Sequence, residues 1–255
     1  MTGQVRLERA GGVARIVLDQ PARRNAMTGA MWRTLPGLVE AAAGDEGVAV
    51  GGLEGAGGHF CGGADIAEFA ETYATAESTA RANAAIAAAM EALASVAKPT
   101  VAVLRGACVG GGVALALACD LRLARGDARF AVTPAKLGLL YSFSDTARLV
   151  RAVGAGPAKD MLFSARVVEA EEALRIGLVQ RVMSNEEMAA YVGALSEASR
   201  PALRGIKQMV GAVEGGVMRE TEELRGLFEG AFAGEDFREG YAAFLGKRGA
   251  VFRGK

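Results

Sequence analysis

The sequence is poor in the residues that support disulfide, metal and histidine-based chemistry. Its 255 residues include three cysteines, one histidine and 6% aromatic residues. Cys61, Cys108 and Cys119 are odd in number and contain no C-x-x-C pair, which argues against a disulfide framework or a zinc site. His59 lies beside a glycine-rich turn, and a Ser-His-Asp hydrolase would have to use it alone. We therefore expect a cytoplasmic protein without a metal, in which the cysteines are small core residues.

The chain also lacks an excess of charge of either sign. It has 29 Lys+Arg against 29 Asp+Glu, so no net field would attract nucleic acid or a membrane surface. Its longest apolar stretch, Ala107 to Cys119, is too short to span a bilayer, and residues 1–9 do not resemble a signal peptide. We expect neither a nucleic-acid nor a membrane partner, and an anionic ligand would need a local basic cluster.

What the sequence does have is apolar content and strand-like alternation near its start. With 51% hydrophobic residues, the chain can bury a sizeable core. Residues 5–9 and 13–19 alternate polar and apolar positions around Gly11-Gly12. This pattern predicts an opening β-hairpin.

Strands and helices are then expected to alternate along the chain. The strands are expected at residues 47–53, 100–104 and 121–124. The helices are expected at residues 28–43, 74–97 and 110–118. Pro36 should kink or break the first of these helices, unless the helix restarts there. Such alternation predicts parallel crossovers and an α/β sheet covered by helices.

The sequence becomes mainly helical after Gly154, with one last strand expected at residues 178–183. The helices are expected at residues 186–198, 201–213, 217–232 and 237–245, separated by Gly or Pro. We divide the chain into an α/β core, residues 1–198, and a helical C-terminal region, residues 199–255.

Two glycine-rich turns carry the strongest chemical signal. Residues 59–66 and 106–112 each leave an expected strand and enter a helix, with little side chain to cover the backbone N–H groups. Either turn alone is more often an ordinary tight turn. Two of them side by side would form an oxyanion hole for an enolate or a tetrahedral intermediate. Neither turn matches the P-loop pattern of nucleotide-binding proteins.

These turns belong to a wider pattern that resembles the crotonase (enoyl-CoA hydratase/isomerase) superfamily along nearly the whole chain. The matching segments are Gln20–Met27, Phe60–Ile66, Lys98–Gly106, Gly110–Gly112, Ala118–Asp120 and Gly138. The resemblance implies a spiral of ββα units and a helical C-terminal region that builds a homotrimer, or a hexamer as a dimer of trimers. It also implies an acyl-CoA thioester held between the N–H groups of Ala64 and Gly111, with no cofactor beyond the CoA.

The resemblance further implies which residues contact the CoA portion. The basic positions are Arg23 or Arg24, together with Lys247 in the tail. Charge-assisted donors of this kind suit a 3′-phosphate and a pyrophosphate, although ordinary surface charge is the alternative for each. The implied CoA site is completed by Ala26, Ala64, Asp65, Ile66 and Phe244.

The sequence departs from the hydratases of this family at two positions. Hydration needs a base for water and an acid for the α-carbon, and these hydratases carry two glutamates. The corresponding positions here are Ala114 and Pro134. Because neither residue can transfer a proton, we expect decarboxylation or double-bond isomerisation in place of hydration.

Residues 133–141 look like the corresponding part of methylmalonyl-CoA decarboxylase, although that pattern retains a glutamate where Ala114 stands. Loss of CO₂ yields an enolate without a base, and Tyr141 could orient the carboxylate or relay the returning proton. Isomerisation needs one base, for which Asp145 and Glu68 are the candidates. Packing for the tyrosine and capping for the carboxylates are the structural alternatives. The alternative from another class is a non-catalytic acyl-CoA-binding protein on the same fold.

Overall fold

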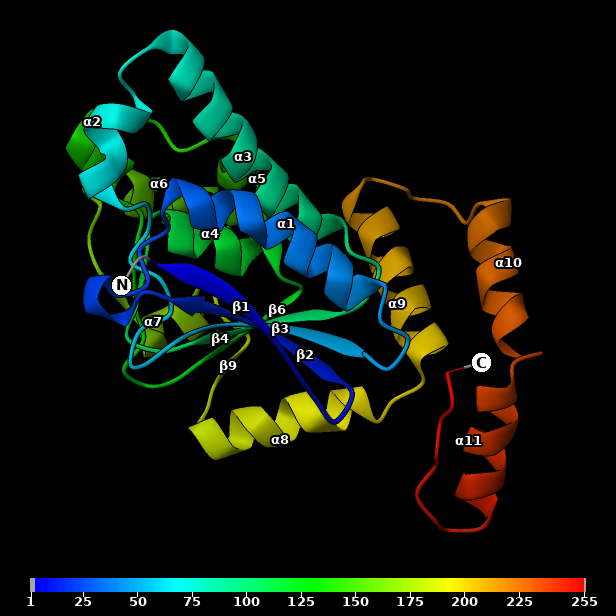
Figure 1. Ribbon diagram of the computed structural model, residues 1–255. Coiled ribbons are helices and arrows are strands. Elements are labelled where there is room, and N and C mark those ends of the chain that lie inside the picture. Colours follow the sequence, from blue (N-terminus) through cyan, green and yellow to red (C-terminus); the bar gives the residue numbers. More distant parts are fainter. Residues whose placement is uncertain (1–2, 255) are drawn as a thin grey trace.

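A six-stranded sheet lies at the centre of the computed structural model, which describes residues 3–254 (Figure 1). In sheet order its strands are β1 (Gln4–Ala10), β2 (Val13–Asp19), β3 (Val50–Gly55), β4 (Thr100–Leu104), β6 (Leu121–Ala124) and β9 (Arg181–Val182). β1 and β2 form an antiparallel hairpin, and every other neighbouring pair is parallel. The predicted hairpin and the predicted parallel α/β sheet are both confirmed.

A second sheet of three short strands was not predicted. Its strands, in sheet order, are β5 (Ala107–Val109), β7 (Arg129–Ala131) and β8 (Val168–Glu169). Strands of two or three residues are too short to show a sequence period. β5 lies inside the glycine-rich segment 106–112, which we had interpreted as one turn between a strand and a helix.

Helices cover both faces of the larger sheet (Figure 1). On one face lie α1 (Gly29–Ala43), α3 (Ala76–Ser95) and α4 (Gly111–Ala118), and on the other lies α8 (Asn185–Ser196). Leu35, Leu53 and Leu115 are almost completely buried on the first side, and Met188 packs against the sheet on the second. The central strands are therefore apolar on both faces, as parallel strands between helical layers require.

The helix break that we considered at Pro36 does not occur. α1 continues through it from Gly29 to Ala43. The proline has no N–H to donate to the Trp32 carbonyl four residues earlier, which destabilises the helix. Burial of Met31, Leu35 and Val39 against the sheet offsets that loss.

The remaining helices lie around the edges of the core. They are α2 (Phe69–Thr72), α5 (Phe143–Val153), α6 (Ala155–Ser164), α7 (Ala170–Arg175), α9 (Arg200–Glu214), α10 (Glu222–Ala231) and α11 (Glu235–Leu245), with 3₁₀ turns at Pro21–Arg23, Ile66–Glu68 and Pro134–Leu137. The helix expected from residue 217 begins only at Glu222, where the Thr221 side chain accepts the Leu224 N–H. No helix in residues 3–254 is long and apolar enough to cross a bilayer.

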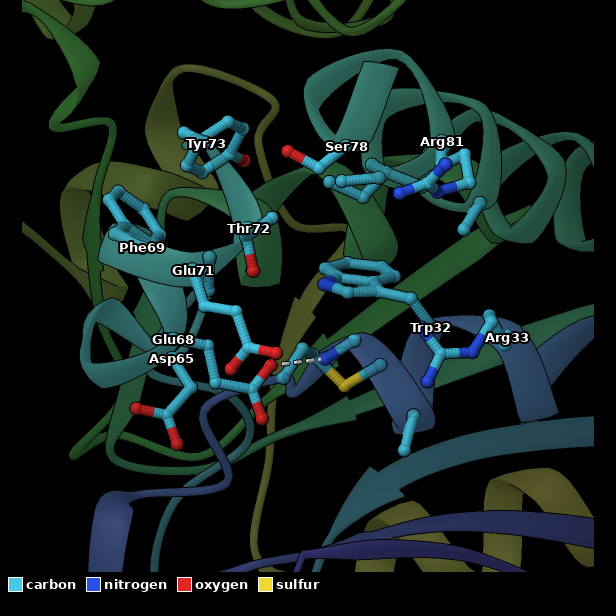
Figure 2. A pocket seen from close by; sticks show the side chains of 17 residues that line it. Trp32, Arg33, Asp65, Glu68, Phe69, Glu71, Thr72, Tyr73, Ser78 and Arg81 are labelled. Atoms are coloured by element: carbon cyan, nitrogen blue, oxygen red, sulfur yellow. Dashed lines mark hydrogen bonds between the residues drawn. The ribbon is translucent and has the colours of Figure 1, made fainter. Parts of the chain in front are cut away.

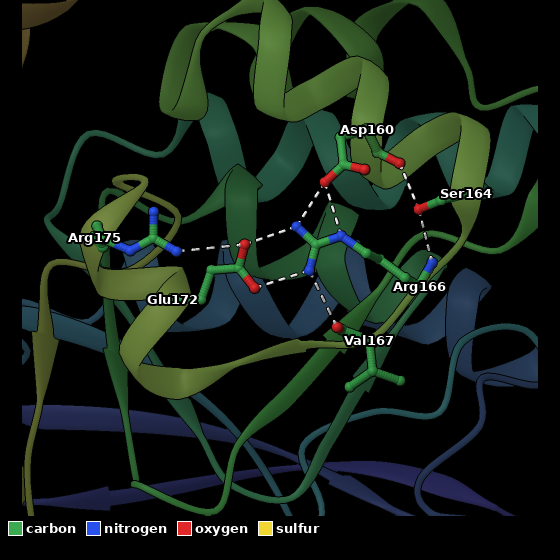
Figure 3. A network of polar contacts seen from close by, with 6 residues as sticks. All are labelled: Asp160, Ser164, Arg166, Val167, Glu172 and Arg175. Carbon is green, nitrogen blue, oxygen red and sulfur yellow. Dashed lines mark hydrogen bonds and ion pairs between the residues drawn. The ribbon is translucent and has the colours of Figure 1, made fainter.

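An ion-pair network joins α6 to α7 (Figure 3). The Arg166 guanidinium pairs with Asp160 at 2.6 Å and with Glu172 at 2.7 Å. These hydrogen bonds raise the pKa of Arg166 and lower that of Glu172. Lys136 adds a bond from its Nζ to the Ala165 carbonyl at 3.0 Å, so the Pro134–Leu137 turn is tied to the end of α6.

Figure 1 shows α9, α10 and α11 to one side of the sheet. α9 is attached to the core through Lys207, whose Nζ lies 2.8 Å from an Asp120 carboxylate oxygen, and through Arg200, which donates to the Glu46 carbonyl at 2.6 Å. α9 and α10 bury none of their residues. The division of the chain at residue 198 stays a prediction.

Gly112 lets α4 lie directly against the first glycine-rich turn. A Cβ at this position would lie 2.5 Å from the Cys61 carbonyl oxygen and 3.0 Å from the Cys61 Cβ. We predict that Gly112→Ala lowers the free energy of unfolding by about 2 kcal/mol, because the core must shift to accept the methyl group. Urea denaturation measures this change.

Gly193→Ala is the matched control, since Gly193 lies within α8 and a Cβ there would meet no atom within 4 Å. It should raise stability by roughly 0.5–1 kcal/mol. Equal stability of Gly112→Ala and the wild type would contradict the close approach.

Candidate active site

The tertiary structure places the two glycine-rich turns side by side. The Cys61 N–H donates to the Ala107 carbonyl at 3.0 Å, and the Val109 N–H donates to the Cys61 carbonyl at 2.9 Å. The first turn is thereby attached to β5. An ideal Cβ on Gly111 would lie 3.9 Å from the Ala64 nitrogen. The two residues that the resemblance singled out are therefore neighbours.

Ala64 and Gly111 each carry an N–H group that donates to no acceptor among residues 3–254. The chain around Ala64 is nevertheless held firmly, because the Met27 N–H donates to the Gly63 carbonyl at 2.7 Å and the Asp65 N–H to the Met27 carbonyl at 2.9 Å. Gly111 is the first residue of α4 and has no intrahelical acceptor. Two adjacent donors on fixed backbone are suited to binding a negatively charged oxygen.

A cavity of about 520 Å³ opens beside Ala64 (Figure 2). It lies between the start of α1, the segment around α2 and the first turns of α3. Trp32 forms one wall, and its ring carbons Cζ2 and Cη2 lie 3.3 and 3.5 Å from the Cβ position of Gly111. The charged side chains that line the cavity are Arg33, Asp65, Glu68, Glu71 and Arg81. A ligand in this cavity therefore meets both an aromatic wall and charged groups.

Glu68 is the predicted acid or base that lies on this cavity. Its Oε2 accepts the Gly29 N–H at 2.7 Å, at the first residue of α1 (Figure 2). Oε1 has no partner among the described residues. One oxygen of Glu68 therefore caps α1, as the capping alternative predicted. This hydrogen bond also holds the carboxyl group on the cavity wall.

Glu71 lines the same cavity and was not among the residues predicted for the site. It lies on α2, which has only four residues. So short a helix has no periodicity that would have indicated the direction of this side chain.

The other two candidate proton carriers, Tyr141 and Asp145, do not line the cavity. The Tyr141 hydroxyl donates to the Gly110 carbonyl at 3.2 Å. Burial, reinforced by the Asp145 charge, raises the pKa of this phenol well above its ordinary value. Asp145 accepts from the Ser142 hydroxyl at 2.6 Å and pairs with Arg148 at 3.3 Å, while Ser142 caps α5 by accepting the Asp145 N–H.

Arg23 is paired with Asp65 and is not a free cation. Its Nη1 lies 2.7 and 2.9 Å from the two carboxylate oxygens of Asp65, which is buried. Arg24 is exposed and has no ion pair among the described residues. Within residues 3–254, Arg24 therefore has its whole guanidinium unpaired, whereas Arg23 shares Nη1 with Asp65. Ala26 is buried next to the loop, whereas Ile66 is largely exposed.

Phe244 and Lys247 do not approach the cavity within one chain. Phe244 lies near the end of α11, and Lys247 follows two residues after that helix. Figure 1 shows α11 on the opposite side of the molecule from α2. The residues implied for CoA binding therefore do not form one continuous site in a single chain.

The two positions that hold glutamates in hydratases contain no group able to transfer a proton. Ala114 is buried in α4, and its N–H donates to the Gly110 carbonyl at 3.2 Å. Pro134 begins a 3₁₀ turn. Both residues thus have structural roles, one in the core and one in a turn.

The contacts of His59 and the burial of the cysteines favour structural roles for these residues. His59 Nδ1 accepts the Ala107 N–H at 3.0 Å, which favours a loop role over that of a catalytic base. Burial raises the pKa of Cys61 and of Cys119 to about 12, so both stay protonated thiols. Within residues 3–254, His, Cys, Asp and Glu side chains form no group of three suited to a metal ion.

The Asn25 side chain joins three backbone segments beside the site and was not among the predicted site residues. It is completely buried and adopts a left-handed backbone conformation with φ 56°. Its Nδ2 donates to the carbonyls of Ala56 at 2.9 Å and His59 at 2.7 Å, and its Oδ1 accepts the Gln20 N–H at 2.9 Å. Asn adopts this conformation more readily than most residues. An Asn in the loop after the opening hairpin could therefore have been identified from the sequence as a turn-forming residue.

Comparison with known proteins gives a consistent result. The model of the enoyl-CoA hydratase/isomerase family matches residues 8–255. A solved structure described as a putative enoyl-CoA hydratase/isomerase family protein from Hyphomonas neptunium is 43% identical, with a TM-score of 0.93 over 98% of both chains.

Two curated proteins are also similar over most of their length. A probable enoyl-CoA hydratase from Mycobacterium bovis is 34% identical over 96% of both chains. The 2,3-dehydroadipyl-CoA hydratase of Escherichia coli is 32% identical over 94% of both chains. With the structural likeness, these matches confirm the predicted fold class.

We predict that Asn25→Asp destabilises the protein by about 3 kcal/mol at neutral pH. The carboxylate would face the carbonyls of Ala56 and His59, to which the amide now donates, and two buried acceptors would lose their donors. Urea denaturation at several pH values measures the effect. The loss should shrink as the pH falls, since a protonated carboxyl can donate to one carbonyl.

Asn185→Asp serves as the control, because Asn185 is exposed at the start of α8, where an acidic side chain is favourable. It should leave stability within about 0.5 kcal/mol of the wild type. An Asn25→Asp protein as stable as this control would show that Asn25 does not anchor the loop.

Proposed function

Because the chain belongs to the enoyl-CoA hydratase/isomerase family, whose members are enzymes acting on CoA thioesters, we propose that it binds an acyl-CoA with the thioester oxygen between the N–H groups of Ala64 and Gly111. The observation that carries this proposal is the pair of adjacent, unpartnered donors beside a cavity. Negative charge grows on that oxygen as an enolate forms, so the donors bind the transition state more tightly than the substrate. Each such donor contributes about 3–4 kcal/mol.

Within the family's chemistry, double-bond isomerisation suits this site better than hydration. Hydration needs two proton-transferring groups, and the two positions that the resemblance assigns to them hold Ala114 and Pro134, which supply none. Isomerisation of a 3-enoyl ester needs one base. The base removes a proton from the α-carbon, the electron pair moves onto the thioester oxygen, and the proton returns at the γ-carbon. Glu68 is our candidate, since its carboxyl group is fixed on the cavity wall beside Ala64.

Decarboxylation of a malonyl-type ester is the second candidate. Breaking the bond to CO₂ leaves its electron pair on the thioester as an enolate, which then takes up one proton and needs no base. Arg33 lines the cavity and has no ion pair among the described residues, so it could hold the departing carboxylate.

A panel of CoA thioesters, with products followed by mass, tests the proposal. The panel contains crotonyl-CoA to test hydration and 3-hexenoyl-CoA to test isomerisation. Malonyl-CoA and methylmalonyl-CoA test decarboxylation. We expect turnover of the 3-enoyl or a malonyl-type ester and none of crotonyl-CoA. Glu68→Gln separates the two reactions, because it should abolish isomerisation and spare decarboxylation.

Gly111→Pro should reduce turnover by roughly 100-fold or more, because it removes one oxyanion donor. Proline is accepted at the first position of a helix, and no internal hydrogen bond is lost there. Gly111→Ala adds a similar Cβ beside Trp32 but keeps the N–H, so the difference between the two variants isolates the donor. Unchanged turnover in folded Gly111→Pro would overturn the oxyanion site, whereas hydration of crotonyl-CoA would overturn the preference for isomerisation or decarboxylation. Tight binding without any product would identify a non-catalytic acyl-CoA-binding protein.

We also propose that the chain assembles as a homotrimer. α9, α10 and α11 enclose a groove of about 900 Å³ with exposed aromatic side chains, and a second apolar surface surrounds the loop before α5. The groove is lined by Phe228, Phe232, Phe237, Tyr241 and Phe244, and the second surface contains Leu139, Leu140 and Phe143. Apolar areas of this kind indicate a protein interface, and two different surfaces suit a ring of identical chains.

Such a ring would bring the C-terminal helices of one chain close to another chain. Lys247 and Phe244, which lie away from their own cavity, could then contact CoA bound by a neighbour, while Arg24 contacts it from the same chain. The CoA site would be complete only in the assembly.

Light scattering after gel filtration tests the assembly. We predict three times the 26.2 kDa chain mass, or six times if trimers pair. Phe232→Glu should produce smaller species, because it places a charge in the apolar groove. Thr34→Glu adds the same charge at an exposed position of α1 and should leave the mass unchanged. A monomeric wild-type protein would refute the trimer.

A further inference from the structure

The Tyr141 hydroxyl reaches the peptide group that carries one of the two oxyanion donors. The carbonyl of Gly110 and the N–H of Gly111 belong to the same peptide unit. Tyr141 donates to this carbonyl oxygen at 3.2 Å, and the N–H groups of Val113 and Ala114 donate to it at 3.0 and 3.2 Å. One end of the peptide unit therefore has three donors, while the N–H at the other end is left for a ligand.

This peptide unit needs to be held in place, because its orientation decides where the Gly111 N–H points. Gly110 has φ 53° and ψ −111°, a backbone conformation that residues with a Cβ rarely adopt. Its own N–H is bound to the Ala131 carbonyl at 2.8 Å. Among the described residues, Tyr141 is the one side chain that donates to the Gly110 carbonyl. Its hydroxyl therefore opposes rotation of the peptide unit.

The same hydrogen bond also affects the strength of the donor. A donor at an amide oxygen polarises the whole peptide group, which makes its N–H a better donor. The phenol can act in this way only while it is protonated. Its burial, together with the nearby Asp145 charge, raises its pKa well above the ordinary value, so it stays protonated across the neutral range.

Tyr141 does not line the cavity, and its proton is directed at the protein backbone. We propose that Tyr141 is a positioning residue, which orients and polarises the Gly110–Gly111 peptide so that the Gly111 N–H binds the thioester oxygen more strongly. This inference rests on the proposed oxyanion site. It replaces the expectation that Tyr141 itself carries a proton to or from the substrate.

Infrared spectroscopy of bound butyryl-CoA, ¹³C-labelled at the thioester carbonyl, tests this role directly. The saturated ester has no double bond or carboxylate for the proposed reactions to consume, and its carbonyl stretch moves to lower frequency when donors polarise it. In Tyr141→Phe we expect this shift to be smaller than in the wild type by roughly 10–30% or more. Turnover of the ester identified by the panel should fall roughly 10-fold, less than the loss of a whole donor causes. The dissociation constant should change much less than turnover.

Tyr191→Phe is the matched control. It removes a phenolic hydroxyl from α8, which lies on the other face of the sheet, and it should retain the full wild-type shift. Tyr141→3-fluorotyrosine keeps the ring and hydroxyl while making the phenol a stronger donor, so it should enlarge the shift. This variant tests the role even if Tyr141→Phe folds poorly.

The outcomes separate this inference from the proposed function. A shift in the wild type that is unchanged in folded Tyr141→Phe, or in Tyr141→3-fluorotyrosine, would overturn the role of Tyr141 and leave the oxyanion site intact. No shift in the wild type would overturn the oxyanion site, and the positioning role with it.

Discussion

The backbone pairing of Cys61 with β5 is the interaction on which the candidate site depends. Two hydrogen bonds, to Ala107 and from Val109, hold the two glycine-rich turns against each other. The approach is so close that a Cβ on Gly63 would lie 2.9 Å from the Val109 carbonyl oxygen. Glycine is therefore needed here for space as well as for its positive φ of 98°. This pairing brings Ala64 and Gly111 together, with an ideal Cβ on Gly111 lying 3.9 Å from the Ala64 nitrogen.

Side chains around this pairing hold the backbone, whereas the donors that we propose for the thioester oxygen are backbone N–H groups. Asn25 joins the preceding loop to the first turn, Glu68 binds the start of α1, and Tyr141 binds the peptide before Gly111. A site whose donors are backbone N–H groups can keep its geometry while the residues that transfer protons change. In the proposed site, Ala114 and Pro134 replace proton-transferring residues while the two backbone N–H groups remain, so function must be argued from the site residues and not from the fold.

The cavity and the C-terminal helices limit which chemistry and which assembly are compatible with the fold. Trp32 packs beside Gly111 and forms a rigid wall where an acyl group would lie, while charged side chains line the rest of the cavity. The aromatic residues of α10 and α11 remain exposed in one chain, although burying them would contribute about 25 cal/mol per Å² of apolar surface. A single chain thus leaves this apolar surface exposed to water, and association with another chain would bury it.

The sequence by itself determined the opening hairpin, the parallel sheet, the two glycine-rich turns and the family, because these depend on local period and on residue type. It did not indicate β5, β7 or β8, whose two or three residues are too short to show a period. Only the tertiary structure decided which candidates reach the cavity. Glu68 lies there because the Ile66–Glu68 turn reaches the first residue of α1, whereas Tyr141 is turned toward the Gly110 carbonyl and α11, which Lys247 follows, lies on the opposite side of the molecule from α2. Contacts between residues far apart in sequence depend on how the elements pack, and a local pattern carries no information about that.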